Sequence, residues 1–275
     1  MKYIRGFLMA WGNFSALPCP YHKWHEDSRK AMLCMLPLVG AMLAVIVCVA
    51  WWLLDLIGVP AILTGAILTA LYFICNGFIH LDGFMDCSDA ILSRRPELSE
   101  RQRILKASDV GAFAVISVVM MLLVFAASMM TLTEGFSIEK AGILLVVMTV
   151  SRSVAADAVG RKPAMKTSQY ADLGETSKSG DVNAFGMAEQ AVIGLIMAIV
   201  ILGVPMVVTG AEPTVLYILY YAPVAIVAIA AACGIGAYAR KQLGGMNGDI
   251  AGYMVVMSET IAVLAAAVLA ACLGL

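Results

Sequence analysis

Long runs of apolar residues are the feature that most limits what this chain can fold into. Of its 275 residues, 61% are hydrophobic and only 13% are charged, whereas soluble domains are nearer half apolar and a quarter charged. About 20 apolar residues suffice to cross a bilayer as a helix, and lipid leaves an unpaired backbone group without a hydrogen-bond partner. The sequence therefore predicts an all-α, polytopic integral membrane bundle.

We expect a single domain over residues 1–275 with about seven transmembrane helices. The segment 3–14 is not one of these helices, and it can lie on the membrane surface as an amphipathic helix. The seven expected spans are roughly 31–57, 60–79 continuing through 80–92, 111–132, 138–159, 184–208, 214–238 and 250–275.

The positive charges predict how the bundle is oriented. Of the 18 Lys and Arg residues, only Lys140 lies near the second of two sets of loops, which is very short. Positive charge favours cytoplasmic loops, so we expect the N-terminus, and any active site, to face the cytoplasm from the cytoplasmic (inner) membrane. The first set of loops is 1–30, 93–110, 160–183 and 239–249, and the second lies near 58, 133–137 and 209–213.

Two other classes of function find little support. No basic stripe with interleaved aromatic residues is present, so a nucleic-acid partner is not expected. The seven cysteines form no CxxC pair, and most lie within apolar runs. They are typical of buried thiols in a reducing compartment.

Three aspartates follow an apolar run in the segment HLDGFMDCSDA, residues 80–90. Asp82, Asp86 and Asp89 are four and three residues apart, which places them on one face of a helix. Such carboxylates must be protonated, be neutralised by a cation, or face water at a helix end. Oxygen ligands of this kind suit Mg²⁺. Gly83 leaves room for a ligand or another helix to approach.

Two further polar features accompany the aspartates. His80 can serve as a ligand or proton carrier, or hydrogen-bond a neighbour. The segment LGGMNGDIAG, residues 243–252, contains Gly245, Asn247 and Asp249. It suits either a phosphate-binding loop or a turn that caps the last helix. In the first case, Asp249 would complete the metal site.

Charged residues also occur within and beside the spans. Arg152, inside an apolar run, is expected to bind a phosphate or a carboxylate, because a charge in the membrane is usually paired or functional. Glu259 either orients a metal ligand or balances Arg152. Arg94, Arg103 and Lys106 follow the aspartates and can bind phosphates, although cytoplasmic loops are generally basic.

Acidic metal ligands, basic residues and a glycine turn at one membrane face indicate phosphoryl or phosphodiester transfer. The alternative is a corrinoid or ion transporter, or a binding protein without catalysis. A transporter usually places polar residues near the bilayer midplane and contains an inverted repeat. The acids gather at one face here, which favours an enzyme.

Four elements resemble the cobalamin synthase (adenosylcobinamide-GDP ribazoletransferase) family. HLDGFMDCSDA is similar to the family signature HLDGLADTADG, and FSALPCP at 14–20 is similar to FTRLPVP. LGGMNGDIAG resembles LGGxTGDxxGA, and ILKASDVGAFA resembles IMKDSRxGxFG. Their order and spacing fit across nearly the whole chain.

The resemblance implies a Mg²⁺-dependent transferase, integral to the cytoplasmic membrane, that joins adenosylcobinamide-GDP to α-ribazole or its 5′-phosphate. GMP leaves, and adenosylcobalamin or its 5′-phosphate forms. Expected partners are these substrates, the lipid bilayer, further copies of the chain and other late enzymes of the cobalamin pathway. By matching position, the resemblance implies that the metal ligands are Asp82, Asp86 and Asp89 and that Asn247 and Asp249 lie in a second family element. The candidate catalytic acids are Asp82, Asp86 and Asp249, with either Asp82 or Asp249 taking the hydroxyl proton. Ser108 and Asp109 are further candidates for binding substrate.

The chain departs from the family pattern at five positions. Ala90 replaces a glycine at the end of the first signature, and Asn247 replaces a threonine. Ala107 stands where the family has Asp, and Asp109 where it often has Arg or His. Val256 replaces the first of two late glutamates. The three aspartates of the first signature are retained.

Overall fold

A computed structural model describes residues 1–21, 23–170 and 215–275 of the chain. The expected span 184–208 lies outside these residues. The described elements are α1 (Lys2–Phe14), the 3₁₀ turn η1 (Glu26–Ser28), α2 (Arg29–Leu56), α3 (Ala61–Cys75), α4 (Ile79–Leu92), α5 (Leu98–Leu105), α6 (Ala112–Leu132), α7 (Ile138–Arg161), α10 (Val215–Leu243) and α11 (Gly248–Leu273).

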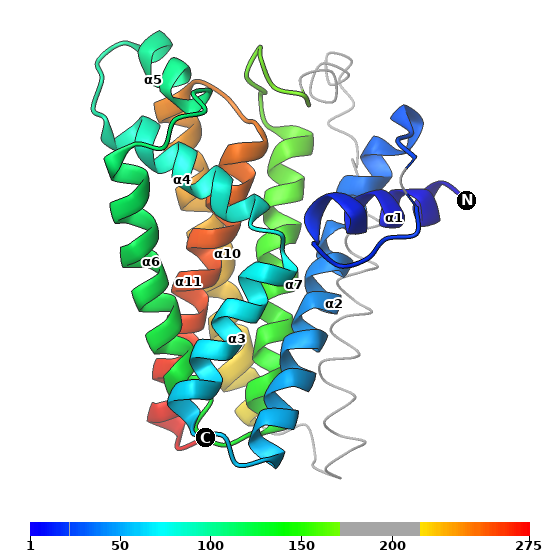
Figure 1. Ribbon diagram of the computed structural model, residues 1–275, viewed down its shortest axis with the longest axis vertical. Coiled ribbons are helices and arrows are strands. Elements are labelled where there is room, and N and C mark those ends of the chain that lie inside the picture. Colours follow the sequence, from blue (N-terminus) through cyan, green and yellow to red (C-terminus); the bar gives the residue numbers. More distant parts are fainter. Residues whose placement is uncertain (22, 171–214) are drawn as a thin grey trace.

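The long helices pack side by side, while α4 and α5 lie at one end of the bundle and the C-terminus lies at the other (Figure 1). Within the described residues, five helices are long and apolar enough to cross a membrane, or six if the bent pair α3 and α4 forms one span. This confirms the predicted helical membrane bundle. The total of seven spans and the cytoplasmic N-terminus stay predictions.

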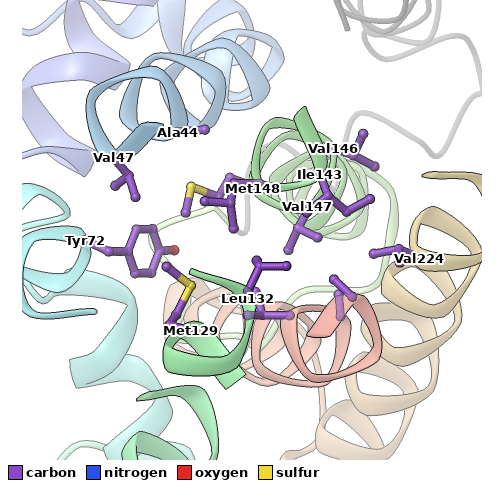
Figure 2. Close-up of a cluster of buried hydrophobic side chains, with 14 of the residues drawn as sticks. Ala44, Val47, Tyr72, Met129, Leu132, Ile143, Val146, Val147, Met148 and Val224 are labelled. Atoms are coloured by element: carbon purple, nitrogen blue, oxygen red, sulfur yellow. The ribbon is translucent and has the colours of Figure 1, made fainter. Parts of the chain in front are cut away.

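Helix α7 lies at the centre of the bundle. Most of the apolar stretch of α7 is buried inside the bundle, whereas less than a third of the apolar stretch of α6 is buried, as expected of a lipid-facing helix. Figure 2 shows one layer of the core, in which Tyr72 of α3, Met129 of α6 and Met148 of α7 lie close to one another. Val224 of α10 closes another side of this layer.

The N-terminal segment forms α1, as the amphipathic pattern predicts. Gly6, Met9 and Ala10 are buried, and the helix packs against α2. The side chains of Tyr3 and Ile4 remain exposed. Helix α1 lies across the bundle rather than along it (Figure 1), so its last residue reaches the same region as α4.

The expected continuous helix from residue 60 to residue 92 is wrong. Helix α3 ends at Cys75, and α4 leaves it at an angle of 90°. Gly77 and Phe78 between them have φ angles of 62° and 59°, a left-handed conformation that interrupts the helix and that a residue with a bulky side chain rarely adopts. The break makes α4, with its aspartates, cross the end of the bundle.

A buried polar network secures this break. Arg152 of α7 donates from Nη1 to Oε1 of Glu259 on α11 at 2.5 Å. From Nη2 it donates to Oδ1 of Asn76 at 2.7 Å and to the hydroxyl of Tyr72 at 3.1 Å. Tyr72 donates its own hydroxyl to the second carboxylate oxygen of Glu259. Because Asn76 caps α3, Arg152 links the start of the break to two other helices.

This network decides between the roles predicted for its two charged members. Arg152 is fully buried and binds a carboxylate, that of Glu259. Glu259 therefore balances Arg152. Its Oε1 also accepts from Ser151 at 2.5 Å, so its oxygens are engaged inside the bundle.

We expect the substitution Glu259→Gln to destabilise the protein strongly. Removing one partner of a buried ion pair leaves the other charge uncompensated, which costs about 3–5 kcal/mol. Thermal unfolding of the purified protein in detergent, followed by tryptophan fluorescence, measures this loss.

Two controls accompany this experiment. Tyr72→Phe removes only a hydroxyl and should cost about 1 kcal/mol. The double variant Arg152→Met/Glu259→Met should recover much of the stability, because no charge is left buried alone. Equal unfolding temperatures for the wild type and Glu259→Gln would contradict the assignment.

Candidate functional site at the crossing of α4 and α11

Helices α4 and α11 touch through two glycines. A Cβ atom added at Gly83 would lie 2.8 Å from the Cα of Asp249, and one added at Gly252 would lie 2.9 Å from the carbonyl oxygen of His80. Both distances are shorter than real side chains tolerate, so larger residues would push the helices apart. Gly83 thus admits another helix, one of its two predicted roles. The close crossing brings Asp82 and Asp249 to the same cavity.

The glycine loop before α11 is fixed to the segment that follows α7. The Met165 N–H donates to the Met246 carbonyl at 2.9 Å, and the Met246 N–H donates to the Pro163 carbonyl at 2.8 Å. Gly245 has a φ of 148°, and a Cβ there would lie 2.7 Å from the Met165 nitrogen. Gly245 therefore permits this backbone contact, and it does not line the cavity described below.

Asn247 caps α11, which confirms the capping interpretation of this turn. Its Oδ1 accepts from the Ile250 N–H at 2.9 Å, as an N-cap side chain does. Its Nδ2 donates to Oδ2 of Asp249 at 2.6 Å. The same residue thereby starts the helix and orients the carboxylate of Asp249.

A cavity of about 130 Å³ lies beside the crossing. Its polar end is formed by His80, Asp82 and Asp249, and the rest of its wall is mainly apolar. The cavity lies where the last residue of α1 meets α2, α4, α7, α11 and residues 169–170. The lining residues are Phe14, Leu33, Leu36, Ile79, His80, Asp82, Ala155, Ala156, Val159, Gln169, Tyr170, Gly248, Asp249, Ala251 and Val255.

His80 is buried at this cavity, with 7% of its surface exposed. Its ring stacks on that of Phe14 with 5.7 Å between the centroids. Its buried Nε2 has no hydrogen-bond partner in the part of the chain that the structure describes. An unsatisfied buried ring nitrogen is unfavourable, which makes Nε2 a place for a ligand atom.

Negative charge gathers at the crossing. The half-buried Asp86 experiences the charges of Asp82, Asp249 and Asp89, in that order of strength. Over the described ranges, none of these four carboxylates forms an ion pair with Lys, Arg or His. Asp82 is exposed and the other three carboxylates are partly buried. Like charges held close together repel one another, so the site favours a bound cation.

Asp89 packs against the start of α6. Its carboxylate lies against Gly111, the N-cap of α6, so closely that a Cβ there would overlap it. Within residues 1–21, 23–170 and 215–275, no group of three or more His, Cys, Asp or Glu side chains converges on a metal position. The acids that share the crossing are Asp82, Asp86 and Asp249. One or two carboxylates supplemented by water and substrate phosphates suit Mg²⁺.

The segment 93–110, which follows α4 and carries several basic residues, lies beside the acids without reaching the cavity. Helix α5 packs against the end of α10, where Gln102 donates to the Leu243 carbonyl at 2.8 Å. The remaining residues predicted to bind substrate are exposed, and none lines the cavity. These residues are Arg94, Arg103, Lys106, Ser108 and Asp109.

Three residues of the region were not singled out from the sequence. Phe14 belongs to the FSALPCP element, which was a usable signal. Tyr170 closes the cavity, and its burial raises the pKa of its phenol. Arg29 donates to the Gln169 carbonyl, and its guanidinium lies 5.9 Å from the centre of the Tyr170 ring. Nothing in the sequence around Tyr170 or Arg29 indicates that they meet.

Comparison with known proteins shows where the chain belongs. Residues 6–267 match the sequence model of the family described as cobalamin-5-phosphate synthase. Proteins named adenosylcobinamide-GDP ribazoletransferase are similar over almost their full length. The one from Clostridium perfringens strain SM101 is 31% identical over 264 residues, covering 95% of this chain and 97% of its own.

Two further relatives bear the same name. That of Clostridium botulinum strain Alaska E43 is 30% identical, covering 96% of this chain and 97% of its own. That of Lachnoclostridium phytofermentans is 28% identical, covering 96% and 94%. No solved structure matches the chain. The family match and the full-length relatives together place this chain in the cobalamin-5-phosphate synthase family.

Proposed function

We propose that this chain is an adenosylcobinamide-GDP ribazoletransferase that acts at the cytoplasmic face of the inner membrane. Its relatives carry this name. The observation that carries the proposal is the crossing of α4 and α11, where Asp82 and Asp249 border one cavity and Asp86 adds to their negative charge. Such an acidic site suits a reaction on a diphosphate that is bound to a metal cation.

The proposed reaction is an in-line displacement at the phosphorus next to the cobinamide arm. A ribose hydroxyl of α-ribazole, or of its 5′-phosphate, forms the new phosphorus–oxygen bond. The bond from that phosphorus to the oxygen shared with the GMP phosphate breaks, and GMP leaves with the bonding electrons. The proton of the hydroxyl passes to a carboxylate, either Asp82 or Asp249, both of which border the cavity.

The acids at the crossing fit a hard divalent cation. One or two of the carboxylates of Asp82, Asp86 and Asp249 would hold Mg²⁺ together with water and substrate phosphates, and the ion would supply positive charge to the diphosphate and to the departing phosphate. Arg94, Arg103 and Lys106, exposed beside α4, supply further positive charge for the phosphates of a substrate that enters from this end. Arg152 has no part in this, because Glu259 occupies it inside the bundle.

The central test is release of GMP. The protein purified in detergent, given adenosylcobinamide-GDP, α-ribazole and Mg²⁺, should form GMP and adenosylcobalamin in equal amounts. Chelation with EDTA should abolish both products, and added Mg²⁺ should restore them. Corrinoid binding or uptake without GMP would support the transporter alternative, and full activity after exhaustive chelation would remove Mg²⁺ from the proposal.

The geometry also predicts a ranking among the aspartates. Asp82→Asn and Asp249→Asn should each lower GMP release by about 10²–10³-fold, the loss seen when one transition-state contact is removed. Asp89→Asn should lower it less than about 10-fold, because Asp89 packs on Gly111 rather than at the cavity. Initial rates at saturating substrate, with unfolding temperatures to confirm folding, measure this ranking. Equal losses in all three variants would count against it.

A further inference from the structure

We propose that the cavity beside the α4–α11 crossing is the subsite for the aromatic base of the acceptor nucleoside, and that Nε2 of His80 hydrogen-bonds a ribose hydroxyl. This inference rests on the proposed function and adds to it which substrate enters the cavity and in which orientation. Four observations support it, namely the size of the cavity, the polarity of its wall, the free nitrogen of His80 and the position of the acids.

The size of the cavity suits a ring system rather than a whole substrate. Its volume of about 130 Å³ is close to that of a cavity of about 150 Å³ known to hold benzene, so it can take one ring of a bicyclic base. Sites for drug-sized molecules occupy about 300–1,000 Å³. A corrinoid ring cannot enter, whereas the benzene ring of a benzimidazole can.

The wall of the cavity selects among aromatic bases. Most of its wall consists of aliphatic side chains from α2, α7 and α11, including Leu36, Ala156 and Val255, and Phe14 and Tyr170 provide aromatic surface. A guanine base would leave several donors and acceptors without partners there, which is unfavourable. An alkylated benzimidazole, the base of a ribazole, has few polar atoms and matches this surface. The nucleoside acceptor therefore fits better than the guanosine of the donor.

His80 marks the boundary between the apolar and polar parts. Its ring stacks on that of Phe14, and its backbone lies against Gly252. That nitrogen is buried and lacks a partner in the described part of the chain. A ribose hydroxyl attached to a base in the apolar part can satisfy it.

The same placement brings the nucleoside to the acids. Asp82 and Asp249 border the polar end of the cavity, so a ribose held near His80 lies next to them. The base anchors the molecule, and the hydroxyl that attacks phosphorus faces the proposed diphosphate site. Holding the two reactants in this order can supply much of the rate increase.

The two alanines of α7 that line the cavity provide a size test. Ala156 is fully buried, and Ala156→Val would take up space that the two ring methyl groups of α-ribazole would occupy. We expect kcat/KM for α-ribazole, relative to the same nucleoside without these methyl groups, to fall about 10-fold or more. The KM for adenosylcobinamide-GDP should not change.

Two variants guard against indirect effects. Ala158→Val makes the same change at a buried position of the same helix outside the cavity lining, and should leave the ratio between the two nucleosides unaltered. Val159→Ala enlarges the cavity and should improve use of nucleosides with bulkier bases, even if Ala156→Val folds poorly. An unaltered ratio in Ala156→Val together with no gain in Val159→Ala would overturn the proposal.

His80 is tested separately by His80→Phe, which keeps the stacking ring and removes Nε2. We expect the KM for α-ribazole to rise about 10-fold or more while the KM for adenosylcobinamide-GDP is unchanged, because a hydrogen bond is lost to one substrate only. Equal changes in both KM values would contradict the contact.

Binding measurements separate this inference from the proposed function. Isothermal titration of α-ribazole into the wild type and Ala156→Val, in detergent without the second substrate, reports on the cavity alone. Weaker binding by Ala156→Val in a protein that releases no GMP would support the subsite and refute the transferase. GMP release by the wild type with equal ribazole affinity and selectivity in both proteins would refute the subsite and leave the transferase standing.

Discussion

The close crossing of α4 over α11 is the contact on which the candidate site depends. Gly83 and Gly252 let the two backbones approach, and no other pair of residue types would allow it without a shift. The crossing joins two segments that are more than 150 residues apart along the chain. It places an acid from each helix at one cavity and leaves His80 at the boundary of that cavity.

The crossing in turn requires the 90° break between α3 and α4. A chain this apolar would more simply continue α3 as one straight span. Gly77 and Phe78 prevent that by adopting left-handed backbone angles, and Arg152 holds the broken end through Asn76. The buried ion pair with Glu259 thus has a local purpose, because it positions the element that carries the aspartates.

Much of the fold followed from apolar runs and helical periodicity, because lipid permits few alternatives to helices. The positions of α2, α6, α7 and α11 agree with the expected spans to within a few residues. The direction of α4 did not follow, since the run from residue 60 to residue 79 contains no proline or charge after its start that would predict a bend. The N–H groups of Gly77 and Phe78 donate to the carbonyls of Ile74 and Phe73 at the end of α3, and apolar periodicity alone does not reveal this local arrangement.

The candidate site was predictable in its chemistry and less so in its membership. Spacing along one helix grouped Asp89 with Asp82 and Asp86, but spacing does not reveal that α6 starts beside Asp89 and packs against its carboxylate. Arg152 and Glu259 were recognisable as costly charges in apolar spans, and their pairing followed only from the packing of α7 against α11. The sequence around Tyr170 did not indicate a role, because this residue reaches the cavity only through the path that the chain takes after α7.

The arrangement also explains how a helical membrane bundle can serve water-soluble, highly charged substrates. The interior of the bundle offers a largely apolar cavity, and its end offers carboxylates that remain partly exposed. A nucleoside with an apolar base and a polar ribose matches both surfaces at once, whereas a phosphate group matches only the charged end once a cation is present. Mutual repulsion among the acids keeps that end unfavourable until a cation binds. Under the proposed function, the cavity would hold the nucleoside so that its hydroxyl lies beside the charged end at which a cation and the diphosphate would bind.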